Sequence, residues 1–137
     1  MVPVLLPTTK VLALCDPLRQ SPWEGRGRVT AAMVRFALKT RRYRAEPVPR
    51  IAAAREHASR IAYLVERGWD DAIDIDVGIP SMHCYVRWPV QDGNHRLAAA
   101  AFRQDAGILA VVGGDLDYAL DLFGVECEEN YPEKESQ

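Results

Sequence analysis

Residues 92–96, Asp-Gly-Asn-His-Arg, bring together residue types that bind anions. An apolar segment precedes them and an alanine-rich segment follows, so they lie where a strand ends and a helix begins. The first amides of a helix have no partner within it, and its dipole is positive at that end. Gly93 permits a tight turn and the close approach of a ligand, and His95 and Arg96 add side-chain donors. The pattern predicts a phosphate seat formed by Gly93, Asn94, His95 and Arg96.

A purely structural interpretation of the same five residues is also open. Asp92 or Asn94 would cap the helix, Gly93 would form the turn, and Arg96 would pair with a nearby acid. However, a cation in the first turn opposes the helix dipole, and a bound anion would offset this unfavourable placement.

The elements that must position this turn are predicted from hydrophobic periodicity and from Gly, Pro and capping residues. Strands are predicted at 2–6, 11–15, 73–79, 82–90 and 108–112. Helices are predicted at about 30–40, 51–65, 94–106 and 115–123, the last three followed by Gly68, Gly107 and Gly124. Residues 16–28, with two Pro and two Gly around Trp23, are predicted to form a loop.

With these neighbours, the Gly-Asn-His-Arg turn resembles that of the ParB/sulfiredoxin-like superfamily. The helix 60–69 that closes with a Gly, the strand 73–77 and the strand 108–112 follow the family's order, and the resemblance covers residues 50–123. It implies a compact α/β (α+β) fold, with a small mixed sheet flanked by helices. It also implies that Gly93, Asn94, His95 and Arg96 bind the phosphates of a nucleoside di- or triphosphate, with or without Mg²⁺, in a DNA-associated process.

Two departures limit what the resemblance carries over. Sulfiredoxins have a catalytic Cys immediately before the His-Arg pair, where this chain has Asn94, so reductase chemistry of that kind is not expected. ParB proteins continue into a helix-turn-helix and a dimerisation domain, whereas residues 126–137 are too short and too acidic for either.

An enzyme that uses the same turn, a small-molecule kinase or nucleotide hydrolase, is the alternative function. Phosphoryl transfer would need a carboxylate as base. Asp92 is the nearest candidate in sequence, and Asp70 and Asp71 are its rivals. Asp74 and Asp76 project on one side of a predicted strand, where they could hold Mg²⁺ or form the polar outer face of the sheet.

The other His and Cys side chains give weaker signals. His57 lies at the edge of the apolar face of its predicted helix, so we expect a surface or partly packed residue rather than a catalytic one. His83 and Cys84 are neighbours on a predicted strand and would point apart, so they do not form a nucleophile–base pair.

A basic cluster follows Thr30, the predicted N-cap of its helix. Arg35, Lys39 and Arg42 recur at steps of four and three, which places them on one helix face, and Arg41 and Arg44 widen the cluster. The cluster could contact nucleic acid in a non-enzymatic interaction module spanning residues 30–44, supply further phosphate ligands, or simply be a solvated helix face.

The composition suits a globular domain. The chain has 137 residues, of which 48% are hydrophobic, and a net charge of -2, which argues against wholesale coating of nucleic acid. The charge is uneven, because residues 1–50 hold ten basic and three acidic residues and residues 51–137 hold seven and sixteen. We expect one domain over 1–124 and an acidic flexible tail over 125–137.

Compartment signals point to the cytoplasm. Three Cys, at positions 15, 84 and 127, lack CxxC spacing and give an odd number, which favours free thiols in a reducing compartment. No apolar run approaches the roughly 20 residues that span a bilayer, so no membrane association is expected.

Overall fold

The computed structural model describes residues 2–23 and 27–128, which fold around a four-stranded mixed sheet. The strands are β1 (Val4–Pro7), β2 (Ile73–Asp76), β3 (Val90–Asp92) and β4 (Gly107–Gly113), in the spatial order β1-β4-β2-β3. The central strand β4 is antiparallel to β1 and parallel to β2, and β3 pairs antiparallel with β2 at the sheet edge. The predicted α+β class, with a small mixed sheet flanked by helices, is confirmed.

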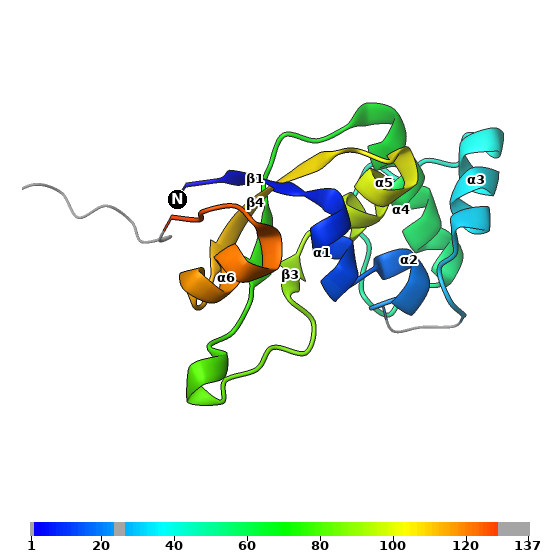
Figure 1. Cartoon of the computed structure of the whole chain (residues 1–137). Helices are drawn as coiled ribbons and strands as arrows, with labels where there is room; N and C mark the ends of the chain where they lie inside the picture. The colour runs from blue at the N-terminus through cyan, green and yellow to red at the C-terminus, as the bar shows by residue number, and fades with distance from the viewer. Residues whose placement is uncertain (1, 24–26, 129–137) are drawn as a thin grey trace, which may run out of the picture.

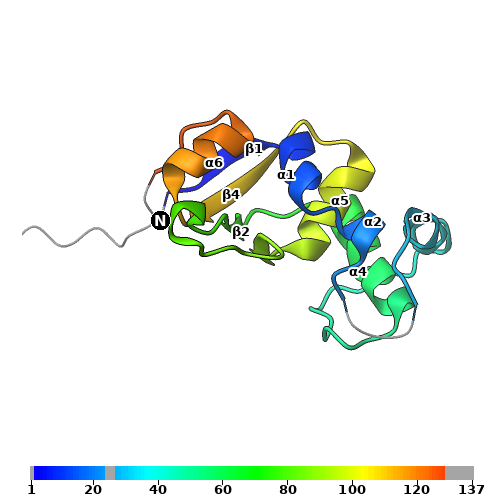
Figure 2. The ribbon, with the colours of Figure 1, turned by 60° about the horizontal axis from the view of Figure 1, so that its bottom comes forward.

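The helices divide between the two ends of the molecule. They are α1 (Thr8–Leu14), α2 (Pro17–Gln20), α3 (Ala31–Thr40), α4 (Ala54–Arg67), α5 (Asn94–Arg103) and α6 (Leu116–Phe123). Helices α2, α3 and α4 gather at one end, the sheet and α6 lie at the other, and α5 lies between them (Figures 1 and 2). Within the described ranges, no helix has the length and apolar character needed to cross a membrane.

Helix α5 joins the two halves of the hydrophobic core. Its Leu97 and Ala100 are buried among residues of the sheet, whereas Ala98 and Ala99 are buried among residues of α3 and α4. Alanine at these positions lets α4 approach α5 closely, because there is no longer side chain to hold the helices apart. The alanine-rich sequence therefore sets how near the side chains of α4 come to the start of α5.

Three predicted elements are wrong. Residues 11–15, expected as a strand, form the end of α1 and its C-cap Cys15, and Val11 and Cys15, four residues apart, are both buried. Residues 82–90 form an irregular loop that starts with the short 3₁₀ helix η1 (Pro80–Met82), and only Val90 joins β3. Met82 and Cys84 of this loop are exposed. Helix α5 ends at Gln104 in the left-handed conformation, so Gly107 begins β4 and is not the cap.

Most predicted helix ends are confirmed. Thr30 caps α3 through its hydroxyl, which accepts from the amide of Met33. The carboxylate of Asp115 likewise accepts from amides at the start of α6. Gly68 and Gly124 follow α4 and α6 with positive φ. The expected loop 16–28 contains the short helix α2, which Asp16 caps. Of the expected tail, residues 125–128 are described and Cys127 is buried, whereas residues 129–137 lie outside the described ranges.

Candidate functional site

The turn between β3 and α5 has the predicted position and a backbone that requires glycine. Gly93 has φ 112°, and a Cβ there would lie 2.7 Å from Cβ of Ile73 on the neighbouring strand β2. Gly93 itself occupies the N-cap position, so the expectation that Asp92 or Asn94 caps the helix is wrong. Among the described residues, nothing accepts a hydrogen bond from the amides of 94–96. The positive end of α5 is therefore uncapped.

The side chains of the turn all have partners within the protein. Asn94 accepts a 2.7 Å hydrogen bond from the indole of Trp88. The Arg96 guanidinium donates to the carbonyls of Asp71 and Ala72, at 3.0 Å each, and lies 3.4 Å from the Asp92 carboxylate. Of the structural roles considered for these side chains, the pairing of Arg96 with a nearby acid is present, whereas Asn94 binds Trp88 and does not cap the helix. The anion donors that stay available at this turn are its backbone amides.

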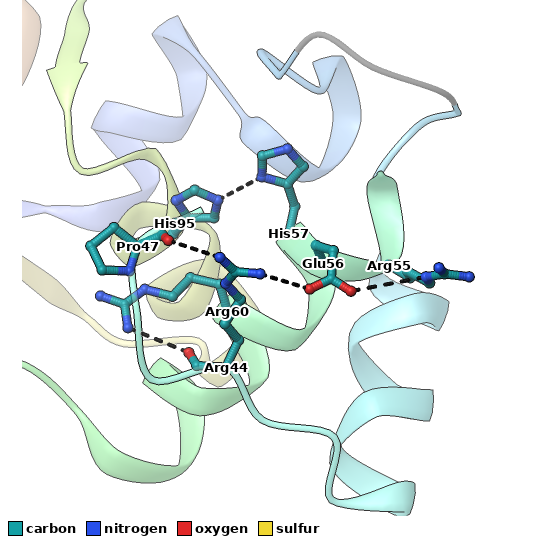
Figure 3. Close-up of polar contacts among 7 residues, drawn as sticks. All are labelled: Arg44, Pro47, Arg55, Glu56, His57, Arg60 and His95. Carbon is teal, nitrogen blue, oxygen red and sulfur yellow. Dashed lines mark hydrogen bonds and ion pairs between the residues drawn. The ribbon is translucent and has the colours of Figure 1, made fainter. Parts of the chain in front are cut away.

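His95 forms a hydrogen-bonded pair with His57 of α4. Nδ1 of His57 lies 2.9 Å from Nε2 of His95, and one of the two nitrogens donates the proton (Figure 3). The indole of Trp23 lies nearly parallel to both imidazoles, with centroid distances of 5.0 and 4.7 Å. His57 is 1% exposed, so the expected surface or partly packed position is wrong; the close approach of α4 to α5 encloses it. Its Nε2 makes no hydrogen bond of good geometry with any described residue.

Both imidazoles of this pair are neutral near pH 7. Burial, together with the nearby His57, Arg60 and Arg96, lowers the pKa of His95 to about 3. Burial also lowers the pKa of His57, against the carbonyls of Arg50 and Ala52, which raise it. His95 therefore adds no positive charge to the start of α5, contrary to the role of a cation considered from the sequence.

A cavity of about 780 Å³ opens in front of the turn. Among the described residues, its wall contains residues 92–96, which include Asp92 and Arg96, and also three further arginines, a second carboxylate and three tryptophans: Arg50, Arg60, Arg87, Asp71, Trp23, Trp69 and Trp88. With His95 neutral, the formal charge of these side chains is positive. The volume lies within the range of small-molecule binding sites. The cavity therefore combines cationic and aromatic surfaces at the positive end of a helix.

Hydrogen bonds hold the far wall of this cavity in place. The Arg44 guanidinium lies 2.9 Å from Glu56 and donates to the carbonyl of Pro47, a cavity residue (Figure 3). Arg60 of α4 donates to the carbonyls of Arg44 and Ala45. These contacts fix the segment after α3 against α4, and Arg60 at the same time lines the cavity.

The predicted carboxylate candidates separate in space. Asp92 and Asp71 line the cavity and are exposed, whereas Asp70 is not part of the wall. Asp76 accepts a hydrogen bond from the amide of Gly78, a local turn contact. In the part of the chain that is described, no group of three or more His, Cys, Asp or Glu could hold a metal ion, and Asp74 and Asp76 thus form no such centre.

The basic cluster is only partly on one helix face. Arg35 and Lys39 are exposed on α3, but the helix ends at Thr40, and Arg42 lies beyond it with its guanidinium 5.9 Å from the Phe36 ring. Arg44, expected to widen the cluster, turns away to pair with Glu56. Arg35, Lys39 and Arg42 do not line the cavity at the Gly93 turn, so they do not supply further ligands to a phosphate at that turn.

Sequence reasoning missed the tryptophans and Arg87 as site residues. Each Trp adjoins a turn-forming residue, in Pro22-Trp23, Gly68-Trp69 and Trp88-Pro89, and a large aromatic on a connecting segment is a signal of a binding surface. No comparable signal marks Arg87, which lies in the loop before β3.

Comparisons with protein-family models, with curated proteins and with solved structures give no match.

Proposed function

We propose that the cavity in front of α5 binds a nucleotide, with its phosphates at the start of the helix. The observation that carries the proposal is the uncapped positive end of α5 opening into a cavity lined by arginines and tryptophans. Backbone amides and the helix dipole favour a phosphate at Gly93. Indole rings offer stacking surfaces for a base, as in many sites that bind nucleotides. The resemblance of the Gly-Asn-His-Arg turn to ParB-like domains supports the same ligand class.

Arg87 is the side chain best placed to test this proposal. It is exposed, lines the cavity, and makes no hydrogen bond or ion pair with the residues that the structure describes. Its guanidinium is thus available to a phosphate, and its removal leaves no internal partner unsatisfied. A charge-assisted hydrogen bond contributes roughly 1.5–3 kcal/mol, so Arg87→Ala should weaken nucleotide binding by roughly 10- to 100-fold.

The experiment is a thermal-shift panel of nucleoside mono-, di- and triphosphates, with and without Mg²⁺, followed by calorimetry on the best ligand. A ligand at 100 times its Kd adds roughly 2.7 kcal/mol to the free energy of unfolding. Arg19→Ala, which removes an exposed arginine outside the cavity, is the matched control and should bind like the wild type. If no nucleotide raises Tm, or if Arg87→Ala and Arg19→Ala bind alike, nucleotide binding at this cavity is wrong.

Phosphoryl transfer or nucleotide hydrolysis is the second candidate, because two exposed carboxylates share the cavity with the proposed phosphate seat. Asp92 or Asp71 would accept the proton of the attacking hydroxyl or water. Phosphate release measured over hours should then fall at least tenfold in Asp92→Asn or Asp71→Asn. Asp70→Asn, next in sequence but outside the cavity wall, should keep the wild-type rate. Binding without phosphate release would leave the nucleotide-binding proposal standing alone.

A further inference from the structure

A second hollow, between α3 and α4, combines exposed aromatic rings with cations. Its volume is about 580 Å³, and its floor consists of small or flexible apolar side chains: Ala32, Met33, Ala37 and Ala58. Phe36 and Tyr43 line it and are 57% and 37% exposed, respectively. None of the described residues lines both this hollow and the cavity in front of α5. We refer to it as the α3–α4 groove.

The charges around the α3–α4 groove are mainly positive. Arg42 and Arg55 line it; the Arg55 side chain is 82% exposed, and its Nε lies 3.9 Å from Glu56. Of the two acids in the wall, Glu56 is held by Arg44 at 2.9 Å, which leaves Glu46. Lys39 lies one turn after Phe36, and Arg35 one turn after Ala32, so both flank the groove. Exposed Arg41 ends the same helix.

We propose that the α3–α4 groove binds single-stranded nucleic acid, with bases on Phe36 and Tyr43 and the backbone on the surrounding cations. Proteins that bind single strands combine a cationic track with exposed rings on which bases stack. In a duplex the base faces are stacked on each other, so exposed rings add affinity only for unpaired bases. The positive charge is a local property of this surface, because the chain as a whole carries a net charge of -2.

An acidic peptide is the competing occupant, and the walls of the groove favour it less. Helices and a connecting segment form these walls, and none of the four strands contributes to them. An extended peptide would therefore find no sheet edge with which to pair. Stacking on Phe36 and Tyr43 needs only the ring faces that the groove exposes.

The test is fluorescence anisotropy with a labelled 12-nucleotide oligothymidylate and with a duplex of the same length. The single strand should bind more tightly, and its affinity should fall steeply between roughly 50 and 200 mM salt. Phe36→Ala should weaken binding roughly fivefold or more, since it removes one stacking ring. Arg35→Gln/Lys39→Gln/Arg42→Gln should reduce the salt dependence as well as the affinity.

Matched variants separate this proposal from effects of charge or folding. Tyr85→Ala removes another exposed aromatic, and Lys10→Gln/Arg19→Gln/Arg67→Gln removes three exposed cations outside the groove; both should bind like the wild type. Circular-dichroism melts confirm that each variant is folded. The proposal is overturned if no single strand binds at low salt, if the duplex binds equally well, or if Phe36→Ala and Tyr85→Ala behave alike. Binding of an Asp/Glu-rich peptide without binding of the oligonucleotide would also overturn it.

Discussion

The hydrogen-bonded pair His57–His95 sets a pH limit on the stability of the protein. Burial keeps the pKa of His95 at about 3, below its ordinary value of 6.5, and lowers the pKa of His57 as well. In the unfolded chain both imidazoles take up protons as the pH falls below 6.5, whereas the folded protein keeps them neutral. The free energy of unfolding should therefore fall with pH from 6.5 downward. The His95 contribution continues down to about pH 3.

The expected slope is up to about 1.4 kcal/mol per pH unit for each imidazole that stays neutral. Urea unfolding between pH 7 and 5 measures it above the range in which carboxylates titrate. His95→Gln should reduce the slope, because an amide keeps a polar contact but does not titrate, while His83→Gln in an exposed loop should leave it unchanged. A stability that is constant from pH 7 to 5 would show that the pair is protonated in the folded state.

At the level of an element, the position at which α5 starts depends on a single residue, Gly93. The helix can begin beside β2 only because Gly93 has φ 112° and no Cβ to meet Ile73. We expect Gly93→Ala to destabilise the protein by about 2 kcal/mol or more, since it adds a steric overlap to an unfavourable backbone conformation.

The control for this substitution is Gly124→Ala, at the end of α6. Gly124 also has positive φ, 69°, but no atom of the described residues lies within 4 Å of the position of an added Cβ. Gly124→Ala should therefore lower the free energy of unfolding only by the conformational penalty, roughly 1 kcal/mol. Chemical denaturation of both variants measures the difference. Equal losses would mean that Ile73 moves aside and that the approach of α5 to β2 is not restrictive.

Which elements the sequence predicts depends on whether their signal is local. The turn at Gly93, the caps Thr30 and Asp115, and the apolar strand β4 are all specified by neighbouring residues, and they form where expected. The β-prone residues of segment 11–15 favour a strand, but the four-residue spacing of Val11 and Cys15 lets both pack on the core from a helix and its C-cap. The expected strand at 82–90 does not form. Pro80 precedes the segment, Pro89 lies near its end, and Cys84 makes only an isolated bridge with Ile79.

The candidate site is less predictable because it is assembled from distant segments. Gly93, Asn94, His95 and Arg96 follow one another, so their position at a helix start could be read directly. The contact of His57 with His95 joins residues 38 positions apart and depends on how closely α4 packs on α5. The carbonyls of Asp71 and Ala72 that bind Arg96 carry no side-chain signal at all. The backbone of the site can therefore be predicted from residues adjacent in sequence, whereas the roles of its side chains depend on contacts between distant segments.

At the scale of the whole molecule, α5 should make the sheet and the helical end unfold together. One core cluster contains the strands and the other contains α3 and α4, and successive residues of α5 are buried in both. Loss of either cluster would expose one side of α5, so neither half is expected to remain folded alone. We therefore predict a single unfolding transition.

Matched truncations in the two clusters test this cooperativity. Ile61 of α4 and Ile108 of β4 are both almost fully buried, at 0% and 2% exposed. Ile61→Val and Ile108→Val should each cost roughly 0.5–1.5 kcal/mol. Each should lower the same urea midpoint, with circular dichroism and tryptophan fluorescence coincident and the slope m unchanged. If instead Ile61→Val separated the two probes and Ile108→Val did not, the helical end would unfold on its own. Residues from both ends of the molecule line the cavity in front of α5. The cavity would then lose part of its wall before the sheet unfolds.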